Sequence, residues 1–565
     1  MKSRWNDADL TAQNDELDQL VYLSRLLGED HSLVLLGGGN TSAKVRERNL
    51  HGEEEEILYV KGSGTSLEDV NRDSFSPVRL QQVLPLLALH GLSTPVLMNA
   101  FSCAMTRAKS PTPSIETLLH ALLPFPFVTH THADSLLAVG NTEHGEEHIR
   151  DVYGDDVLVV PFRSSGFDLA QCCAEAVRRK MTSKTAGIVL MHHGIFAFGA
   201  NAREAYERMI ALVSRAEDYL KANQAWELPQ KQGSPRHQQG LEIAALRQAV
   251  CRQGNNRPFI LTVDDSPTAL AFAHRPDVAD ISQQGPATPH HAIFTKRVPM
   301  LGRDVATYGD SYRRYLAALT GAVERIDGAP RIVLDPELGL CAIGVNAFYA
   351  DAAAEVYRHT IDIISRASAL DRYRALPAGE ILAAEVEYGG FEHKVRDDER
   401  RPLSGQIVLV AEAASPFGQA CSQALLSRGA AVVGLDKSRD VATLFPPPAY
   451  LGIACDTQVP AAIADALETA ARRYGGVDHV VAPANFPLTL LQPFLALSPV
   501  TNRVVLTDND PKHLEQALAK LVGQGLHANA LRLAGNGAAA GGKLAAEMCG
   551  PLFEKSSNSL IEINK

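Results

Sequence analysis

The chain has 565 residues, enough for three or four domains of ordinary size. Hydrophobic residues make up 45% and charged residues 21%, a balance typical of a water-soluble globular protein, and no apolar run approaches the roughly 18 residues that a membrane span requires. The formal net charge of −11 argues against a nucleic-acid partner, because phosphate backbones bind basic surfaces. The polar start lacks an apolar signal segment and the eight cysteines form no Cys-x-x-Cys pair, so we expect reduced thiols, a cytoplasmic location and no membrane partner.

The first predicted elements end in a loop that suits an anion. Apolar residues at helical spacing predict a helix over residues 8–27, and residues 32–36 predict a buried strand. This strand runs into Gly37-Gly38-Gly39-Asn40-Thr41-Ser42, where glycines let the backbone approach a ligand and the polar side chains offer neutral donors. A tight turn with capping residues explains the same loop equally well.

A second loop of this kind follows the next strand. Residues 57–60 predict a buried strand that leads into Lys61-Gly62-Ser63-Gly64-Thr65, which combines glycines and hydroxyl groups with one cation. Two such loops after neighbouring strands could hold one phosphate or carboxylate between them.

A carboxylate opens the next predicted helix. Pro113-Ser114-Ile115-Glu116 precedes a helix over residues 117–123, which makes Glu116 a candidate general acid or base. A carboxylate in the first turn is also a common partner of the helix dipole. One turn further on, His120 faces the same way and is predicted to be a packed core histidine.

Histidines end the two strands that follow. Residues 127–132 predict a buried strand ending in His130-Thr131-His132, and residues two apart on a strand share a face. A second strand over residues 188–191 ends in His192-His193-Gly194 and offers a third imidazole. Three imidazoles with one open position are typical of a catalytic zinc, and other divalent ions suit the same donors. Asp134 could orient one of the ligand imidazoles.

The middle of the chain predicts a weak repeat of the first part. Residues 332–346 track residues 188–201, and each copy runs into a helix, predicted over residues 352–369 and 203–221. The first region is expected to close with a long helix that runs from residue 196 to residue 223. The histidines do not recur at their places, so we expect no metal site in the second copy. Chance similarity between two buried strand-turn-helix units is the alternative explanation.

The last part of the chain predicts a parallel α/β sheet. Strands over residues 406–410 and 431–436, the helix over 419–429 between them, and a further strand over 478–485 resemble a short-chain dehydrogenase Rossmann domain. The turn Ala411-Glu412-Ala413-Ala414-Ser415-Pro416-Phe417-Gly418 keeps only the last glycine of the phosphate-binding pattern. That family also needs a Tyr-x-x-x-Lys pair, and no tyrosine follows Tyr474. We therefore expect neither NAD binding nor hydride transfer.

Five motifs, taken in order, resemble the class II aldolase/adducin family. They are Gly38-Gly39-Asn40-Thr41-Ser42, Lys61-Gly62-Ser63-Gly64-Thr65, Pro113-Ser114-Ile115-Glu116, His130-x-His132 and His193-Gly194. The resemblance covers roughly the first 220 residues and is greatest to the rhamnulose-1-phosphate aldolase type that carries a C-terminal short-chain dehydrogenase.

The resemblance implies a role for each motif. It makes His130, His132 and His193 the metal ligands, with His193 chosen over His192 because the family's ligand directly precedes the glycine. It also makes Glu116 the general base. It places the substrate phosphate on Asn40, Ser63, Gly64 and Ser114, to which the residues themselves add Lys61. Ile115 stands where relatives with a phosphate site carry a second serine.

These inferences together predict an α/β protein with three domains. Residues 1–225 are expected to form a class II aldolase-like α/β/α sandwich, residues 240–395 a degenerate aldolase-like repeat, and residues 402–565 a degenerate Rossmann domain. The expected activity is that of a zinc-dependent lyase that cleaves a ketose phosphate or sugar acid through an enediolate, in a homo-oligomer as in the family. The alternatives are an epimerase, dehydratase or decarboxylase of the same family, or a non-catalytic scaffold like adducin.

Overall fold

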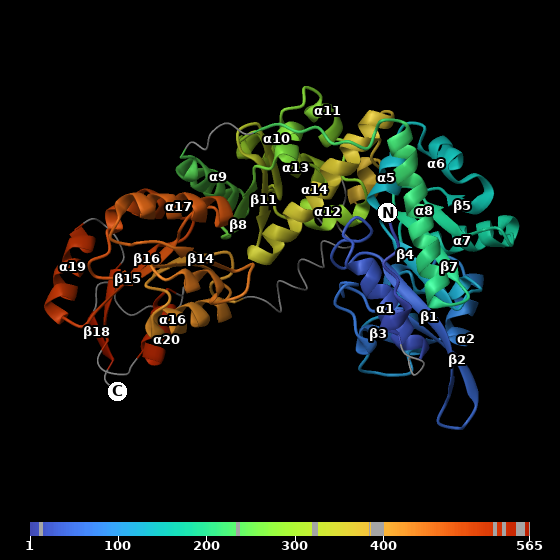
Figure 1. Cartoon of the computed structure of the whole chain (residues 1–565), viewed down its shortest axis with the longest axis horizontal. Coiled ribbons are helices and arrows are strands. Elements are labelled where there is room, and N and C mark those ends of the chain that lie inside the picture. Colours follow the sequence, from blue (N-terminus) through green and yellow to red (C-terminus); the bar gives the residue numbers. More distant parts are fainter. Residues whose placement is uncertain are drawn as a thin grey trace. The chain divides into compact units, whose positions relative to one another are not determined.

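The computed structural model describes residues 1–10, 15–232, 238–318, 326–382, 385, 401–523, 528–533, 538–549 and 560–563 (Figure 1). The chain divides into two compact units, and each is built from several segments. The first unit comprises Met1–Leu228, Asp280–Ala292 and His359–Ala384. The second comprises Pro229–Ala279, Ile293–Arg358 and Glu385–Lys565. The fold is mixed α/β, as predicted, with three separate sheets.

The first unit contains a seven-stranded sheet in the order β3-β2-β1-β4-β7-β6-β5. Its pairs are antiparallel except for β5 with β6. Asn40 at the start of β1 lies opposite His130 near the end of β4, and His130 lies opposite Phe196 on β7. The bounds are β1 Asn40–Arg48, β2 Glu54–Lys61, β3 Phe75–Arg79, β4 Phe127–Thr131, β5 Val157–Val160, β6 Gly187–Leu190 and β7 Gly194–Gly199.

Helices cover both faces of this sheet, because its central strands bury apolar side chains on each side. One apolar core includes residues of four helices: α1 (Glu16–Gly28), α5 (Asp134–Gly140), α6 (Gly145–Tyr153) and α8 (Ala202–Ala222). The other core includes residues of α2 (Leu80–Val83), α3 (Thr94–Ala104), α4 (Thr117–Leu122) and α7 (Phe167–Lys180). The result is the expected α/β/α sandwich.

One predicted element of this unit was wrong, and the predicted start of another was too early. Residues 32–36 form turns and not a strand, because Leu36 and Gly39 take left-handed φ values of 51° and 60° and prevent an extended chain. Leu33, Val34 and Leu35 are nevertheless buried, which explains why their pattern resembles that of a strand. Residues 196–199 belong to β7, and the closing helix begins only at Ala202, where the Asn201 side chain accepts from the Glu204 N–H.

The second unit contains a four-stranded sheet in the order β8-β11-β10-β9. The hairpin of β10 with β11 leads into α14, as the hairpin of β6 with β7 leads into α8, so both copies of the predicted repeat share this arrangement. The strands are β8 Ile260–Asp264, β9 Met300–Leu301, β10 Ile332–Asp335 and β11 Gly339–Gly344. The helices of this part of the chain are α9 Gly240–Gln253, α10 Pro267–Ala273, α11 Val278–Ser282, α12 Pro289–Thr295, α13 Val305–Ala317 and α14 Ala347–Leu370.

The last sheet is parallel throughout, in the order β14-β13-β12-β15-β16-β17-β18. This order reverses direction between β12 and β15, which is the doubly wound Rossmann-like topology that the sequence predicted. Its strands are β12 Ile407–Ala411, β13 Ala431–Asp436, β14 Tyr450–Ala454, β15 His479–Pro483, β16 Arg503–Asp508, β17 Ala528–Leu533 and β18 Leu560–Ile563. Its helices are α16 Pro416–Ser427, α17 Pro460–Tyr474, α18 Gln492–Ala496, α19 Pro511–Gly523 and α20 Ala538–Met548.

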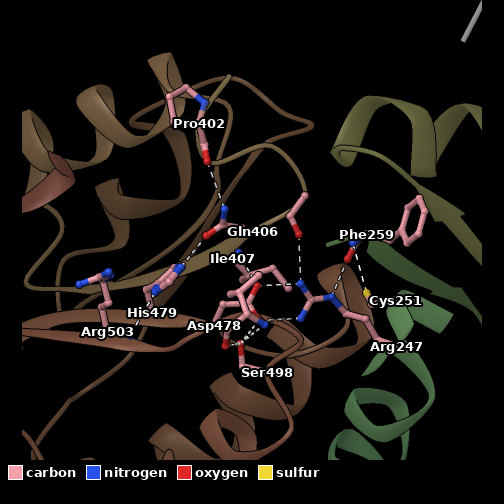
Figure 2. Close-up of polar contacts among 12 residues, drawn as sticks. Arg247, Cys251, Phe259, Pro402, Gln406, Ile407, Asp478, His479, Ser498 and Arg503 are labelled. Carbon is pink, nitrogen blue, oxygen red and sulfur yellow. Dashed lines mark hydrogen bonds and ion pairs between the residues drawn. The ribbon is translucent and has the colours of Figure 1, made fainter. Parts of the chain in front are cut away.

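A buried ion pair joins α9 to this sheet within the second unit. Figure 2 shows Arg247 facing Asp478, with nitrogen to oxygen distances of 2.9 and 2.7 Å. Arg247 also donates to the carbonyl oxygens of Phe259 and Gly405, at 2.6 and 3.0 Å. Both charged side chains are almost fully buried, with exposures of 2% and 0%.

Over the parts of the chain that the structure describes, no helix has both the length and the apolar character needed to cross a bilayer.

Candidate metal centre

The end of β4 carries two imidazoles that meet. His130 is the fourth residue of β4 and His132 follows the strand, so both side chains project to the same side. Their Nε2 atoms lie 3.1 Å apart. The ring of His130 stacks on that of Phe196, with centroids 4.2 Å apart, and its Nδ1–H donates to the carbonyl oxygen of Ile195 at 3.1 Å. This hydrogen bond fixes the tautomer and leaves Nε2 as the ligand atom.

The hairpin between β6 and β7 supplies the third imidazole. His192 takes the left-handed conformation, with φ of 58°, and His193 rather than His192 joins the group. Position 194 has no room for a side chain, which explains the glycine there. A Cβ on Gly194 would lie 2.2 Å from the carbonyl oxygen of Thr131 and 3.0 Å from the ring of His132. The His-Gly pair in the sequence therefore has a packing reason as well as a chemical one.

The three side chains suit a divalent metal. Ligand atoms of His130, His132 and His193 all lie within 4.8 Å of one another. A tetrahedral zinc with Zn–N bonds of about 2.0–2.1 Å holds its ligand nitrogens roughly 3.3 Å apart, close to the 3.1 Å between His130 and His132. Burial lowers the pKa of His130 to about 4 and the pKa of His132 well below its usual value, so both rings are neutral near pH 7. Neutral imidazole is the form that binds metal.

Glu116 lies directly beside this group. Its Oε2 is 3.5 Å from His130 Nε2 and its Oε1 is 3.1 Å from His193 Nε2. Burial raises the pKa of Glu116, but at low pH the protonated rings of His130 and His193, together with the hydrogen bond from Asn40, outweigh that effect and hold the pKa of Glu116 well below its usual value. The carboxyl group is therefore ionised. Within the described part of the chain, Oε1 accepts no hydrogen bond of good geometry, so this oxygen can take a proton.

A buried polar network holds the Glu116 carboxylate. Asn40 Nδ2 donates to Glu116 Oε2 at 2.7 Å and to Ser114 Oγ at 3.1 Å, which uses both of its N–H groups. His120 Nε2 bonds Asn40 Oδ1, and His120 Nδ1 lies 2.7 Å from Ser42 Oγ. Asn40, predicted to bind phosphate, holds the Glu116 carboxylate in this arrangement, and its phosphate role stays a prediction. His120 is buried, as predicted, and belongs to the same network.

The two glycine loops lie side by side next to the histidines. A Cβ on Gly37 would lie 3.3 Å from the Cα of Gly64, so the loops are in close contact. Lys61 is buried and donates to the carbonyl oxygens of Gly37 and Thr65, at 3.0 and 2.7 Å, which uses two of its three N–H groups. Burial lowers the pKa of Lys61 to about 8. Ser63 and Gly64 are exposed; the Ser63 N–H donates to the carbonyl oxygen of Thr112 at 2.9 Å, which leaves the exposed Ser63 hydroxyl as the candidate ligand group.

Two histidines from later in the chain also reach this region, and neither was predicted from the sequence. His290 lies beside His132, with ring centroids 5.4 Å apart. His359 Nδ1 bonds Asp134 Oδ2 at 2.5 Å, so Asp134 contacts this histidine and not one of the predicted metal ligands. Both histidines belong to segments that pack in the first unit.

Two stretches of the chain match known protein families. Residues 18–220 match the class II aldolase and adducin N-terminal domain, and residues 237–394 match the second domain of class II aldolases. Over these two stretches the chain belongs to the class II aldolase/adducin family. A curated relative, the uncharacterized oxidoreductase YuxG of Bacillus subtilis (strain 168), is 29% identical over 519 residues, which span 85% of this chain and 74% of YuxG.

Solved structures resemble separate parts of the chain. The N-terminal class II aldolase domain of a conserved protein from Thermoplasma acidophilum is 37% identical and covers 39% of this chain and 99% of its own, with a TM-score of 0.36. A short-chain dehydrogenase/reductase from Serratia marcescens BCRC 10948 is 16% identical and covers 29% of this chain and 97% of its own, with a TM-score of 0.24.

Proposed function

We propose that the chain is a metal-dependent lyase that breaks a carbon–carbon bond in a phosphorylated or acidic ketose, with zinc as the first candidate metal. The observation that carries this proposal is the approach of Glu116, at 3.1 and 3.5 Å, to two of three imidazoles whose ligand atoms lie within 4.8 Å of one another. The proposed substrate is a small sugar phosphate, and the proposed assembly is a homo-oligomer.

Each group of site residues has a separate proposed role. A divalent ion held by His130, His132 and His193 would act as a Lewis acid toward the substrate's carbonyl oxygen and offset the negative charge that develops as the bond breaks. Glu116 moves the proton through Oε1, while Asn40 holds Oε2. Lys61, Ser63, Gly64 and Ser114 are the candidates for binding the substrate's anionic group.

The direct test is a screen of ketose 1-phosphates for metal-dependent release of dihydroxyacetone phosphate. Glu116→Gln should retain metal and lose about 10²- to 10⁴-fold in kcat, the usual contribution of a positioned acid or base. Glu54→Gln, on the exposed start of β2, is the matched control and should leave kcat unchanged. Unchanged turnover in the Glu116 variant would refute its role.

Metal analysis separates this proposal from a scaffold like adducin. A lyase of this kind should hold about one divalent ion per chain after purification, whereas a scaffold has no need of one. Epimerases, dehydratases and decarboxylases of the family would use the same side chains, so the product distinguishes them. Product analysis with the best substrate therefore completes the assignment.

We propose no hydride transfer by the C-terminal sheet. The turn between β12 and α16 uses its own N–H groups: Ala413 N–H donates to the carbonyl oxygen of Leu435 at 3.1 Å, and Ala414 N–H donates to Asp436 Oδ2 at 2.9 Å. Those donors are then not available to a pyrophosphate. Titration with NADH should show no binding, and saturable binding would overturn this point.

A further inference from the structure

A segment from the second aldolase-like stretch, Asp280–Ala292, packs within the first unit close to the metal centre. Asn141 Nδ2 donates to the carbonyl oxygen of Ala287 at 2.6 Å, and the Tyr373 hydroxyl donates to that of Gly285 at 3.0 Å. At the end of this segment, His291 Nδ1 lies 2.9 Å from Thr360 Oγ1. The backbone that carries His290 is therefore held on both sides by residues of the same unit.

The His290 ring lies where the histidines meet the first glycine loop. It is edge-on to the ring of His132, with centroids 5.4 Å apart and an interplanar angle of 65°. A Cβ on Gly38 would lie 2.9 Å from His290 Cε1, so a side chain at position 38 would displace the imidazole. Lys61 reaches the residue next to Gly38, because its amine donates to the carbonyl oxygen of Gly37 at 3.0 Å. The ring thus lies between the candidate metal site and the candidate anion site.

His290 is not a fourth member of the metal group. Among the described residues, the cluster whose ligand atoms come within 4.8 Å of one another consists of His130, His132 and His193. A neutral imidazole has one N–H donor and one acceptor nitrogen, which suits a hydrogen bond to a substrate oxygen.

We propose, building on the lyase function above, that His290 binds the substrate directly. Its N–H donates to an oxygen of the phosphate or carboxylate group, beside the third N–H of Lys61. A segment that follows the N-terminal aldolase domain in the sequence thereby completes the substrate site within the same chain.

The test measures anion binding, which does not depend on turnover. Titration calorimetry on the full chain, after zinc has been removed with a chelator, would use inorganic phosphate and glycolate as separate probes. The wild type should bind at least one of them, and that one identifies the anionic group. His290→Ala should weaken its binding by about 10- to 100-fold, the usual effect of one hydrogen bond to a charged group. His51→Ala, on the exposed hairpin tip between β1 and β2, is the control and should bind like the wild type.

Two further measurements exclude a structural explanation. His290→Ala should take up zinc as the wild type does, and a loss of zinc would make His290 a ligand and overturn the proposal. Gly38→Ala keeps the imidazole but displaces it, and should weaken the same anion to a similar degree. Equal anion affinity in the wild type and His290→Ala, or no affinity in the wild type, would also overturn it. If anion binding behaves as expected but no ketose phosphate is cleaved, the lyase proposal fails and the binding role of His290 stands.

Discussion

Removing Arg247 tests the buried ion pair of the second unit. Arg247→Met keeps the apolar stem but deletes four hydrogen bonds, two of them to Asp478. Among the described residues, Asp478 would keep the N–H of Ile407 at 2.9 Å and the hydroxyl of Ser498 at 2.8 Å as hydrogen-bond donors. Leaving a buried charge without its partner costs about 3–5 kcal/mol. Two lost hydrogen bonds to a charged group, at about 1.5–3 kcal/mol each, give a similar figure.

The loss of stability in Arg247→Met should depend on pH. Burial raises the pKa of Asp478, but Arg247 outweighs that effect and lowers the pKa below its usual value. The pKa of Asp478 is therefore lower in the folded protein than in the unfolded chain, where it is about 3.9. The ion pair stabilises the protein fully above about pH 3.9, and this stabilisation is lost as the pH falls through the folded-state pKa of Asp478. In Arg247→Met the burial effect remains while the two contributions of Arg247 that oppose it are lost, so the pKa of Asp478 rises. The difference in free energy of unfolding between the wild type and Arg247→Met should therefore be largest near pH 7. It should shrink toward pH 5, because Asp478 in the variant can then take up a proton.

Two spectroscopic signals separate the units in a urea titration. Both tryptophans, Trp5 and Trp226, lie in the first unit, so their fluorescence reports that unit, while far-UV circular dichroism reports both. Arg247→Met should lower the midpoint of the dichroism transition and leave the fluorescence transition in place. Arg252→Met, at an exposed position of the same helix, is the matched control. A dichroism midpoint equal to that of the wild type would refute the reasoning.

Three further predictions concern the metal centre. His193→Ala should lose bound zinc and His192→Ala should keep it, as measured by elemental analysis; the reverse result would show that the wrong histidine was chosen. Asn40→Ala should lower kcat by about 10- to 100-fold with zinc retained, since it removes the hydrogen bond that orients Glu116. Chelation of the metal should shift the tryptophan fluorescence transition to lower urea. Relative to protein in free zinc at 1,000 times its Kd, the free energy of unfolding should fall by about 4 kcal/mol. An unchanged transition would argue against a bound ion.

The sequence was most informative where the chemistry is local. His130 and His132 lie two residues apart on one strand, so alternation alone predicts that their side chains meet. The parallel sheet was predictable because its strands are continuous apolar runs between helices. By contrast, the role of Asn40 depends on the pairing of β1 with β4, which no local pattern encodes.

The errors have physical reasons of the same kind. Residues 32–36 have the apolar pattern of a strand because they are buried, yet the positive φ of Leu36 turns the chain before any pairing occurs. His290 gave no signal because its neighbours come from a region much earlier in the chain. Local patterns identified the residues that share a strand or turn with the metal ligands and missed those that long-range packing brings to them.

The segmented first unit limits how the protein can be dissected. Ala287 and Ile363 are part of the apolar core that α1, α5, α6 and α8 form, although both lie far beyond residue 228. A fragment ending at residue 228 would keep every proposed metal ligand but expose the apolar surface that these two residues cover. Such a fragment should be prone to aggregation, so any shorter version of this chain would need another apolar surface in place of Ala287 and Ile363.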